Sequence, residues 1–310
     1  MFLTKEQEQE LVISIKERCE IPMKFAYMNE GAKNWEKISQ QRSVKGIGSS
    51  EFNLLKKRSR SFIESFENRV RLNVIDLGCG DGTQILPLLD VLKNQKIIFQ
   101  YIPVDISQNL LDVAEKTIKS KYSCEIKKTL FDFELGSFSD ITKLNKYSNL
   151  ICLLGNTIGN FKNINQILKK LKDSMGQDDF LIAGIEVADL SNIDEMLSHY
   201  QGKIMENALS YIPLKLGINK KEISHKTSWN KKENLVEVWM TLKSDQKIKI
   251  GEKCLKLKAN RKILVCRSAK HNEWTFTKLL SDIGFRTELL TTTPDRGYIL
   301  SMVQSTRYST

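Results

Sequence analysis

Three alternating glycines, Gly78, Gly80 and Gly82, directly follow a short apolar segment. Glycine lets the backbone turn sharply and lets a ligand approach without a Cβ in the way. Two acids accompany the turn, because Asp76 lies inside the end of the apolar segment and Asp81 lies between the last two glycines. Carboxylates repel a diphosphate and attract a cation, so the pattern differs from the dinucleotide fingerprint and predicts a positively charged ligand.

S-Adenosylmethionine carries a sulfonium and an ammonium, so these residues favour it as the cofactor and favour methyl transfer as the chemistry. Asp105 ends the next apolar segment, where a carboxylate can accept hydrogen bonds from both hydroxyls of a ribose. Asp132 and Phe133 follow a third segment, where an acid can accept from the adenine amino group while Phe133 or Phe131 stacks on the ring. The alternative is an exposed acid beside an aromatic residue of the core.

A second polar loop, at residues 153–161, contains two glycines and two asparagines close together. We expect Gly155 and Asn156 to contact the cofactor. We expect the amide of Asn160 to hold an amine without charging it. The alternative is that Asn156 and Asn160 cap the helix predicted to follow, because asparagine is a favoured capping residue.

Alternating strand and helix patterns in the first half of the chain position these residues. The expected strands are 73–77, 97–104, 125–130, 150–154 and 180–186. The expected helices between them are 84–92, 108–120 and 164–175. This alternation predicts an α/β fold with a parallel, doubly wound sheet. Ligands of such sheets lie at the carboxyl ends of the strands, which is where the acids and the two loops are expected.

The chain changes character on both sides of this region. Further helices are expected at 6–19, 34–40, 52–66, 192–199, 203–216 and 274–283, and further strands at 222–230, 235–242, 247–250, 255–266, 285–290 and 297–303. The last helix and hairpin complete a Rossmann-like, seven-stranded sheet of the class I methyltransferase type. We therefore predict an S-adenosylmethionine-binding domain at 61–190 and 271–310, and an α+β substrate-binding cap domain at 1–60 and 191–270.

Five motifs lie at residues 25–36, 101–107, 153–161, 207–217 and 225–230. With these motifs the chain resembles the histidine-specific S-adenosylmethionine-dependent N-methyltransferases of the ergothioneine pathway, to which the fungal dimethylallyltryptophan N-methyltransferases are similar. The resemblance covers nearly the whole chain. It implies a Rossmann-like cofactor domain with an added substrate domain, and methyl transfer to the α-amine of an amino acid, with S-adenosylhomocysteine as the second product.

The resemblance also implies roles for individual residues. Asn160 matches the family asparagine that binds the amine, and Tyr27 matches a tyrosine of the substrate pocket. Tyr200 lies beyond a deletion, near a second substrate tyrosine of the family. These three residues are the expected catalytic set, in which Asn160 orients the amine and the tyrosines help through their hydroxyl groups.

Two departures from the family bear on the substrate. The family motif Ile-x-x-Glu-x-Ser-x-Lys appears at residues 263–270 with Cys266 in place of the glutamate, while Ser268 is kept. A pair of family tyrosines is replaced by Val44 and Lys45. Because losing a buried hydrogen bond to an imidazole changes specificity by orders of magnitude, we expect the acceptor to be an amino acid or amino-acid-derived amine other than histidine, held in part by Cys266 and Ser268.

The formal net charge of +11 raises the alternative of a methyltransferase that acts on RNA or protein. Many lysines between residues 220 and 262 alternate with apolar residues, which is typical of the solvated face of antiparallel strands. Few aromatic residues are interleaved with them, so the pattern disfavours a nucleic-acid partner. A third reading, a cofactor-binding scaffold without catalysis, is disfavoured by the intact set of Asp76, Gly78, Gly80, Asp105 and Asn160.

Other classes of protein are excluded by composition. The apolar runs are too short to span a membrane, and acidic residues interrupt the first segment, so we expect a cytoplasmic protein with no membrane partner. The 6 cysteines and 3 histidines show no metal-ligand spacing, so no metal is expected. We expect a monomer with a small-molecule substrate.

Overall fold

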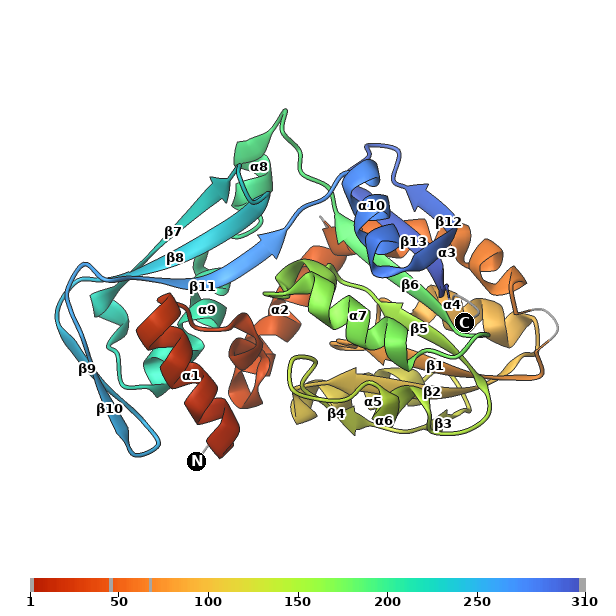
Figure 1. Ribbon diagram of the computed structural model, residues 1–310, viewed down its shortest axis with the longest axis horizontal. Coiled ribbons are helices and arrows are strands. Elements are labelled where there is room, and N and C mark those ends of the chain that lie inside the picture. The colour runs from red at the N-terminus through yellow and green to blue at the C-terminus, as the bar shows by residue number, and fades with distance from the viewer. Residues whose placement is uncertain (1–2, 45–46, 67–68, 307–310) are drawn as a thin grey trace. The chain divides into compact units, whose positions relative to one another are not determined.

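The computed structural model describes residues 3–44, 47–66 and 69–306, with the backbone alone for residues 40–44 and 47–48. The chain forms two compact units. The insertion unit comprises Met1–Ile38 and Asp189–Ala269, and the sheet unit comprises Ser39–Ala188 and Lys270–Thr310. The α-helices and strands of both are labelled in Figure 1. Among the described helices, none combines the length and apolar character needed to cross a membrane.

The sheet unit is built on one large, mainly parallel sheet. Its strands are β1 (Arg71–Leu77), β2 (Ile98–Asp105), β3 (Glu125–Ile126), β4 (Thr129–Leu130), β5 (Ser148–Leu153), β6 (Phe180–Glu186), β12 (Phe285–Thr292) and β13 (Tyr298–Ser305). Neighbouring strands follow the order β12, β13, β6, β5, β1, β2 and β3, and β4 also pairs with β2. Only the hairpin β12–β13 is antiparallel to its neighbours in this order. The predicted α/β class is confirmed.

One strand position differs from the expectation. The single strand expected at 125–130 is two short strands, β3 and β4, which pair with different parts of β2. The described sheet is therefore 8-stranded rather than seven-stranded, although β3 and β4 share one position beside β2. Of the two residues between them, Lys127 still donates from its backbone N–H to the carbonyl of Tyr101 on β2, at 2.9 Å.

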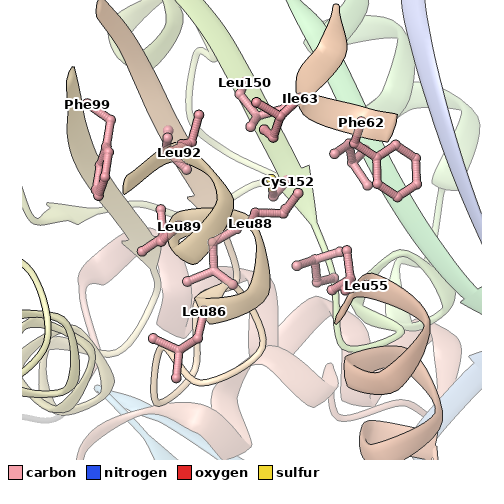
Figure 2. Packing of buried hydrophobic residues seen from close by; sticks show 14 of the residues in the cluster. Leu55, Phe62, Ile63, Leu86, Leu88, Leu89, Leu92, Phe99, Leu150 and Cys152 are labelled. Carbon is pink, nitrogen blue, oxygen red and sulfur yellow. The ribbon is translucent and has the colours of Figure 1, made fainter. Parts of the chain in front are cut away.

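Helices cover both faces of the sheet. They are α3 (Ile47–Glu64), α4 (Leu86–Asn94), α5 (Gln108–Lys119), α6 (Ser139–Thr142), α7 (Ile164–Ser174) and α10 (Glu273–Ile283), with the short 3₁₀ helix η3 (Thr157–Asn160) after β5. One face packs mainly on α3 and α4, where Leu55 and Leu88 meet Leu150 and Cys152 of β5 (Figure 2). The other face packs mainly on α6, α7 and α10. α4 begins two residues later than expected, because Pro87 occupies its first turn.

The sheet unit begins at Ser39, whereas the sequence predicted its start at residue 61. α3 belongs to the sheet unit, whereas the sequence grouped residues up to 60 with the insertion. The reason is packing, because Leu55, Phe62 and Ile63 of α3 are buried in the core of the sheet. Adding α3 extends that core toward the carboxyl end of β5.

The insertion unit is mixed α+β. Its elements are α1 (Lys5–Arg18), η1 (Met23–Tyr27), η2 (Asn29–Gly31), the first half of α2 (Ala32–Val44), α8 (Ile193–Ser198), α9 (Lys203–Lys215), η4 (Lys220–Glu222), β7 (Ile223–Asn230), β8 (Leu235–Leu242), β9 (Gln246–Ile250), β10 (Lys253–Leu257) and β11 (Lys262–Ala269). β7, β8 and β11 form an antiparallel sheet, and β9 and β10 form a hairpin. The strand expected at 255–266 is split, because Asn260 turns the chain with a left-handed φ of 61°.

Candidate functional site

The glycine loop after β1 has three left-handed residues, and they differ in what surrounds them. Gly78, Gly80 and Gly82 have φ values of 70°, 53° and 75°. A Cβ on Gly78 would lie 3.0 Å from the Thr157 side chain, and one on Gly82 would lie 3.1 Å from the backbone of Ala114. Apart from the residues adjacent to it in the chain, no described residue has an atom within 4 Å of a Cβ built on Gly80. The first and last glycines therefore allow the loop to pack, and the middle one borders open space.

Asp105 is fixed beside that open space. Its carboxylate accepts from the backbone N–H of Gly80 at 3.4 Å and from that of Ser107 at 2.9 Å, and its side chain is buried. Burial raises the pKa of Asp105 to about 6, although the hydrogen bonds act in the opposite direction. A carboxylate held next to an uncovered glycine suits the ribose of a nucleoside ligand, so the residues present fit S-adenosylmethionine.

Asp76 occupies the end of β1 and is also buried. The hydroxyl of Tyr101 donates to its carboxylate at 2.8 Å. Burial, with a smaller contribution from the negative charges of Asp105 and Asp81, raises the pKa of Asp76 to about 7, although the hydrogen bond from Tyr101 acts in the opposite direction. A ligand that brings positive charge to this edge of the sheet would relieve the repulsion among these acids.

Asp81 is bound largely within its own loop. One oxygen accepts from the backbone N–H of Thr83 at 3.0 Å and from its hydroxyl at 2.6 Å. The other accepts from the hydroxyl of Ser39 at 3.0 Å. These hydrogen bonds show that Asp81 stabilises the turn, and its carboxylate also adds negative charge beside Asp76.

Asp132 and Phe133 lie beyond β4, next to the end of β2. The backbone of Phe131 donates to the carbonyl of Asp105 at 2.9 Å, which brings this segment to the same edge as the glycine loop. Asp132 accepts from the backbone N–H of Glu134 at 2.9 Å. The half-buried ring of Phe133 stacks on Phe138 with the ring centroids 6.1 Å apart. Both readings of this pair therefore keep structural support, since the ring belongs to an aromatic cluster at the strand ends.

The second polar loop connects β5 to η3. Gly155 and Asn156 are both left-handed, and Gly155 is exposed while Asn156 is buried. The side-chain oxygen of Asn156 accepts from the backbone N–H of Glu186 at 3.0 Å. Asn160 is half-buried at the last position of η3.

The suggestion that Asn156 and Asn160 cap the following helix is wrong. Asn163 is the N-cap of α7, and its side chain accepts from the backbone N–H of Gln166 at 3.0 Å. Asn156 instead ties the loop to the end of β6. The side chain of Asn160 is therefore not used in capping that helix.

One buried acid in this region has no counterpart among the sequence-based expectations. Glu51 of α3 is fully buried, and both of its carboxylate oxygens accept from the backbone N–H of Gly155, at 3.1 and 2.8 Å. Burial raises the pKa of Glu51 to about 7. The available signal was its spacing, because Glu51 shares the helical face of the buried residues Leu54, Leu55 and Phe62.

The insertion unit holds the remaining expected residues. Tyr200 is buried, and its hydroxyl lies 2.9 Å from that of Ser268 as a hydrogen-bond donor. Cys266 is buried on β11, two residues from Ser268, and its sulfur lies 3.4 Å from the sulfur of Met23. The structure thus joins Tyr200 to Ser268 and places an apolar sulfur contact at the position of the family glutamate.

Tyr27 ends η1 in the insertion unit. Its half-buried ring lies 4.5 Å from that of Trp35, and the indole N–H of Trp35 donates to the carbonyl of Ala26 at 3.0 Å. The replacement of paired tyrosines by Val44 and Lys45 lies outside the described side chains. In the described part of the chain, no group of three or more His, Cys, Asp or Glu residues is placed to hold a metal ion.

Comparison with known proteins gives a family match over residues 6–305, described as histidine-specific methyltransferase, SAM-dependent. A histidine N-alpha-methyltransferase from Mycolicibacterium smegmatis is 24% identical over 242 residues, 74% of each chain. One from Mycobacterium tuberculosis is 26% identical over 188 residues, 57% of each chain. The solved structure of the CurJ carbon methyltransferase is 12% identical, covers 98% of this chain and 68% of that chain, and has a TM-score of 0.51, so it shares the fold.

The buried acids predict how the stability of the ligand-free protein depends on pH. The folded-state pKa values of Glu51 and Asp76, about 7, lie above their ordinary values of 4.5 and 3.8. The stabilising contribution of each protonated acid is complete below those ordinary values and is lost as pH rises through about 7. We expect the free energy of unfolding to fall by roughly 0.4 kcal/mol per group between pH 7 and 8.5, above the range in which histidines titrate.

Thermal unfolding of the ligand-free protein across this pH range measures the effect. Asp76→Asn should lose less stability than the wild-type protein as pH rises, because it removes one titrating acid. Equal slopes for the two proteins, or a wild-type melting temperature that rises with pH, would contradict the assignment.

Proposed function

The chain belongs to the family of histidine-specific, S-adenosylmethionine-dependent methyltransferases, and on that premise we propose that it methylates the amine of an amino acid, or of an amino-acid-derived small molecule, other than histidine. The observation that carries the choice of acceptor is the contact between Cys266 and Met23 at the position of the family glutamate. The names of the two mycobacterial relatives support the α-amine as the methylated group.

The cofactor supplies a methyl group activated by a positively charged sulfur. The protein's task is therefore to bind the cofactor and the acceptor, to orient them toward each other and to exclude water. We assign ribose binding to Asp105 and close backbone approach to Gly80, on the strength of the open space beside Gly80. Gly78, Gly82 and Asp81 shape the same loop. The carboxylate of Asp76 favours the positive charge electrostatically, and Asp132 with Phe133 provides the adenine contacts at the adjacent strand end.

The acceptor amine must be neutral and correctly oriented before it can attack. We assign this role to Asn160. Its amide oxygen can accept a hydrogen bond from an N–H of the amine, and the lone pair of the amine nitrogen stays available for attack. An amide carries no charge, so it does not favour the protonated, unreactive ammonium as a carboxylate would. Gly155 and Asn156 hold the backbone from which Asn160 projects.

The side chain of the acceptor is read by residues of the insertion unit in this proposal. Cys266 and Met23 offer sulfur and apolar surface, where a carboxylate would pair with an imidazole N–H. Ser268 keeps a hydroxyl, but its oxygen already accepts from Tyr200. Tyr27 contributes an aromatic edge and a hydroxyl group. These features support an acceptor side chain that is uncharged and less polar than imidazole.

A second candidate, methylation of RNA or protein, is favoured by one feature of the β9–β10 hairpin. Lys247 and Lys256 are exposed and lie directly opposite each other, an arrangement that is destabilising unless an anion is near. The alternation of Lys247 and Lys249 with buried Ile248 and Ile250 also fits an ordinary solvated strand face, as the sequence predicted. The amino-acid proposal rests on more contacts and is preferred.

The role of Asn160 predicts a separation of binding from turnover. Asn160→Ala should retain the affinity for S-adenosylhomocysteine and lose about 100-fold in kcat, because the amine is no longer held in line with the methyl group. Asn163→Ala is a matched control, since it removes an asparagine three positions away that caps α7. This control should lower the stability by about 1 kcal/mol and leave kcat unchanged. An unchanged kcat for Asn160→Ala removes that residue from the mechanism.

The acceptor is tested with a donor that carries a deuterated methyl group. A panel of amino acids, aromatic amines, RNA and protein extract is incubated with the enzyme, and the products are detected by mass spectrometry. We expect an amino acid or its derivative to be labelled more efficiently than histidine. Labelling confined to RNA or protein, or histidine as the best acceptor, would contradict the proposal.

The same assay tests the position of Cys266. Cys266→Glu restores an acceptor for an imidazole N–H and should raise kcat/KM for histidine by at least about tenfold. Cys266→Gln is the matched control, because it has nearly the same shape without the charge. Equal histidine activity in the two variants would show that the carboxylate is not the discriminating group.

A further inference from the structure

The carboxylate of Glu51 is buried where the fold alone gains little from it. Glu51 lies on the apolar face of α3 and is fully buried. The free-energy cost of burying an acid exceeds that of burying an apolar side chain of similar size, so such groups are often replaceable without loss of stability. Glu51 instead accepts a hydrogen bond from the backbone N–H of Gly155, in a loop 104 positions along the chain.

Tyr298 extends this contact to the next residue of the loop. Its hydroxyl donates to Glu51 at 2.6 Å and accepts from the backbone N–H of Asn156 at 3.2 Å. Glu51 and Tyr298 therefore satisfy two consecutive N–H groups, those of Gly155 and Asn156. Both loop residues have left-handed φ values, 70° and 59°, so these hydrogen bonds hold the turn that starts η3.

β6 leaves room for the Glu51–Tyr298 pair. A Cβ on Gly184 would lie 2.5 Å from the Glu51 carboxylate and 2.6 Å from the Tyr298 hydroxyl. Glycine weakens the interior of a strand, and it often marks a place where another group approaches closely. The absence of a side chain at Gly184 is a second, independent sign that the pair is accommodated at this position.

The loop held by this pair also contacts the glycine loop. The Thr157 side chain lies next to Gly78, where a Cβ would come within 3.0 Å of it, and its hydroxyl donates to the carbonyl of Leu154 at 2.7 Å. A shift at Gly155 or Asn156 would therefore move Thr157 against the glycine loop. The same shift would move the far end of η3.

We propose that Glu51 and Tyr298 are positioning residues that fix the loop at 155–160 so that Asn160 presents its amide to the acceptor amine. This inference rests on the proposed role of Asn160. Neither residue contacts the reacting atoms in this scheme. They act through the backbone N–H groups of Gly155 and Asn156.

The test uses Glu51→Gln, Tyr298→Phe and the double variant of the full chain. In Glu51→Gln the amide can still accept from Gly155, but it presents an N–H to the tyrosine and reverses that hydrogen bond. In Tyr298→Phe the N–H of Asn156 loses its acceptor. We expect each variant to lose about tenfold or more in kcat at saturating cofactor, with the affinity for S-adenosylhomocysteine changed by less than about threefold.

Two comparisons separate positioning from a general loss of stability. Glu51→Gln removes a buried charge, so its melting temperature at pH 8 should equal or exceed that of the wild-type protein while kcat falls. The double variant should lose little more kcat than the single ones, because both act through one link. Tyr122→Phe is the matched control, since Tyr122 is a buried tyrosine of the same unit whose hydroxyl donates to Asp90, and kcat should not change.

Hydrogen exchange gives a readout that does not depend on the acceptor. The amide of Asn156 should exchange at least about tenfold faster in Tyr298→Phe, because it loses its acceptor, and the amides of β1 should not change. Unchanged exchange at Asn156 overturns the proposal, and so does faster exchange with full kcat. Failure of the proposed function has a different result, because the wild-type protein would then methylate no amino-acid amine in the panel.

Discussion

Asp76 and Asp105 lie buried at neighbouring strand ends, where burial opposes ionisation and raises the pKa of both carboxyl groups. The parallel register of β1 and β2 puts them there, because Leu77 pairs with Val104 at the edge where both strands end. The glycine loop crosses the same edge and exposes the backbone at Gly80. A ligand with positive charge relieves the repulsion between these acids, and S-adenosylmethionine brings such a charge on its sulfonium.

The second loop depends on the same edge. The backbone N–H groups of Gly155 and Asn156 donate to Glu51 and Tyr298. The side chain of the next residue, Thr157, packs against the glycine loop. In the proposed function, Thr157 therefore links the loop assigned to the methyl donor with the loop that carries Asn160. In the proposed function, Cys266 of the insertion unit contributes to the choice of acceptor, and it is separate in the chain from the residues assigned to the donor.

Features that depend on local sequence were predictable. Strand periodicity located β1, β2 and β6 to within two residues, and the acids that end the strands followed from it. Features that depend on distant packing were not predictable. Three such features join residues that lie far apart in the chain. They are the place of α3 in the sheet unit, the hydrogen bond between Glu51 and Gly155, and the contact of Cys266 with Met23. The capping role of Asn163 was missed because three asparagines compete within one short loop.

The central claim is that buried carboxylates at the strand ends receive a cationic methyl donor. Calorimetric titration at pH 6.5, in two buffers with different ionisation enthalpies, measures the protons released on binding. S-Adenosylmethionine should release protons, because its positive charge favours the ionised form of acids with raised pKa values. S-Adenosylhomocysteine, whose sulfur is neutral, should release fewer. Equal proton release by the two ligands, or none by either, would contradict the claim.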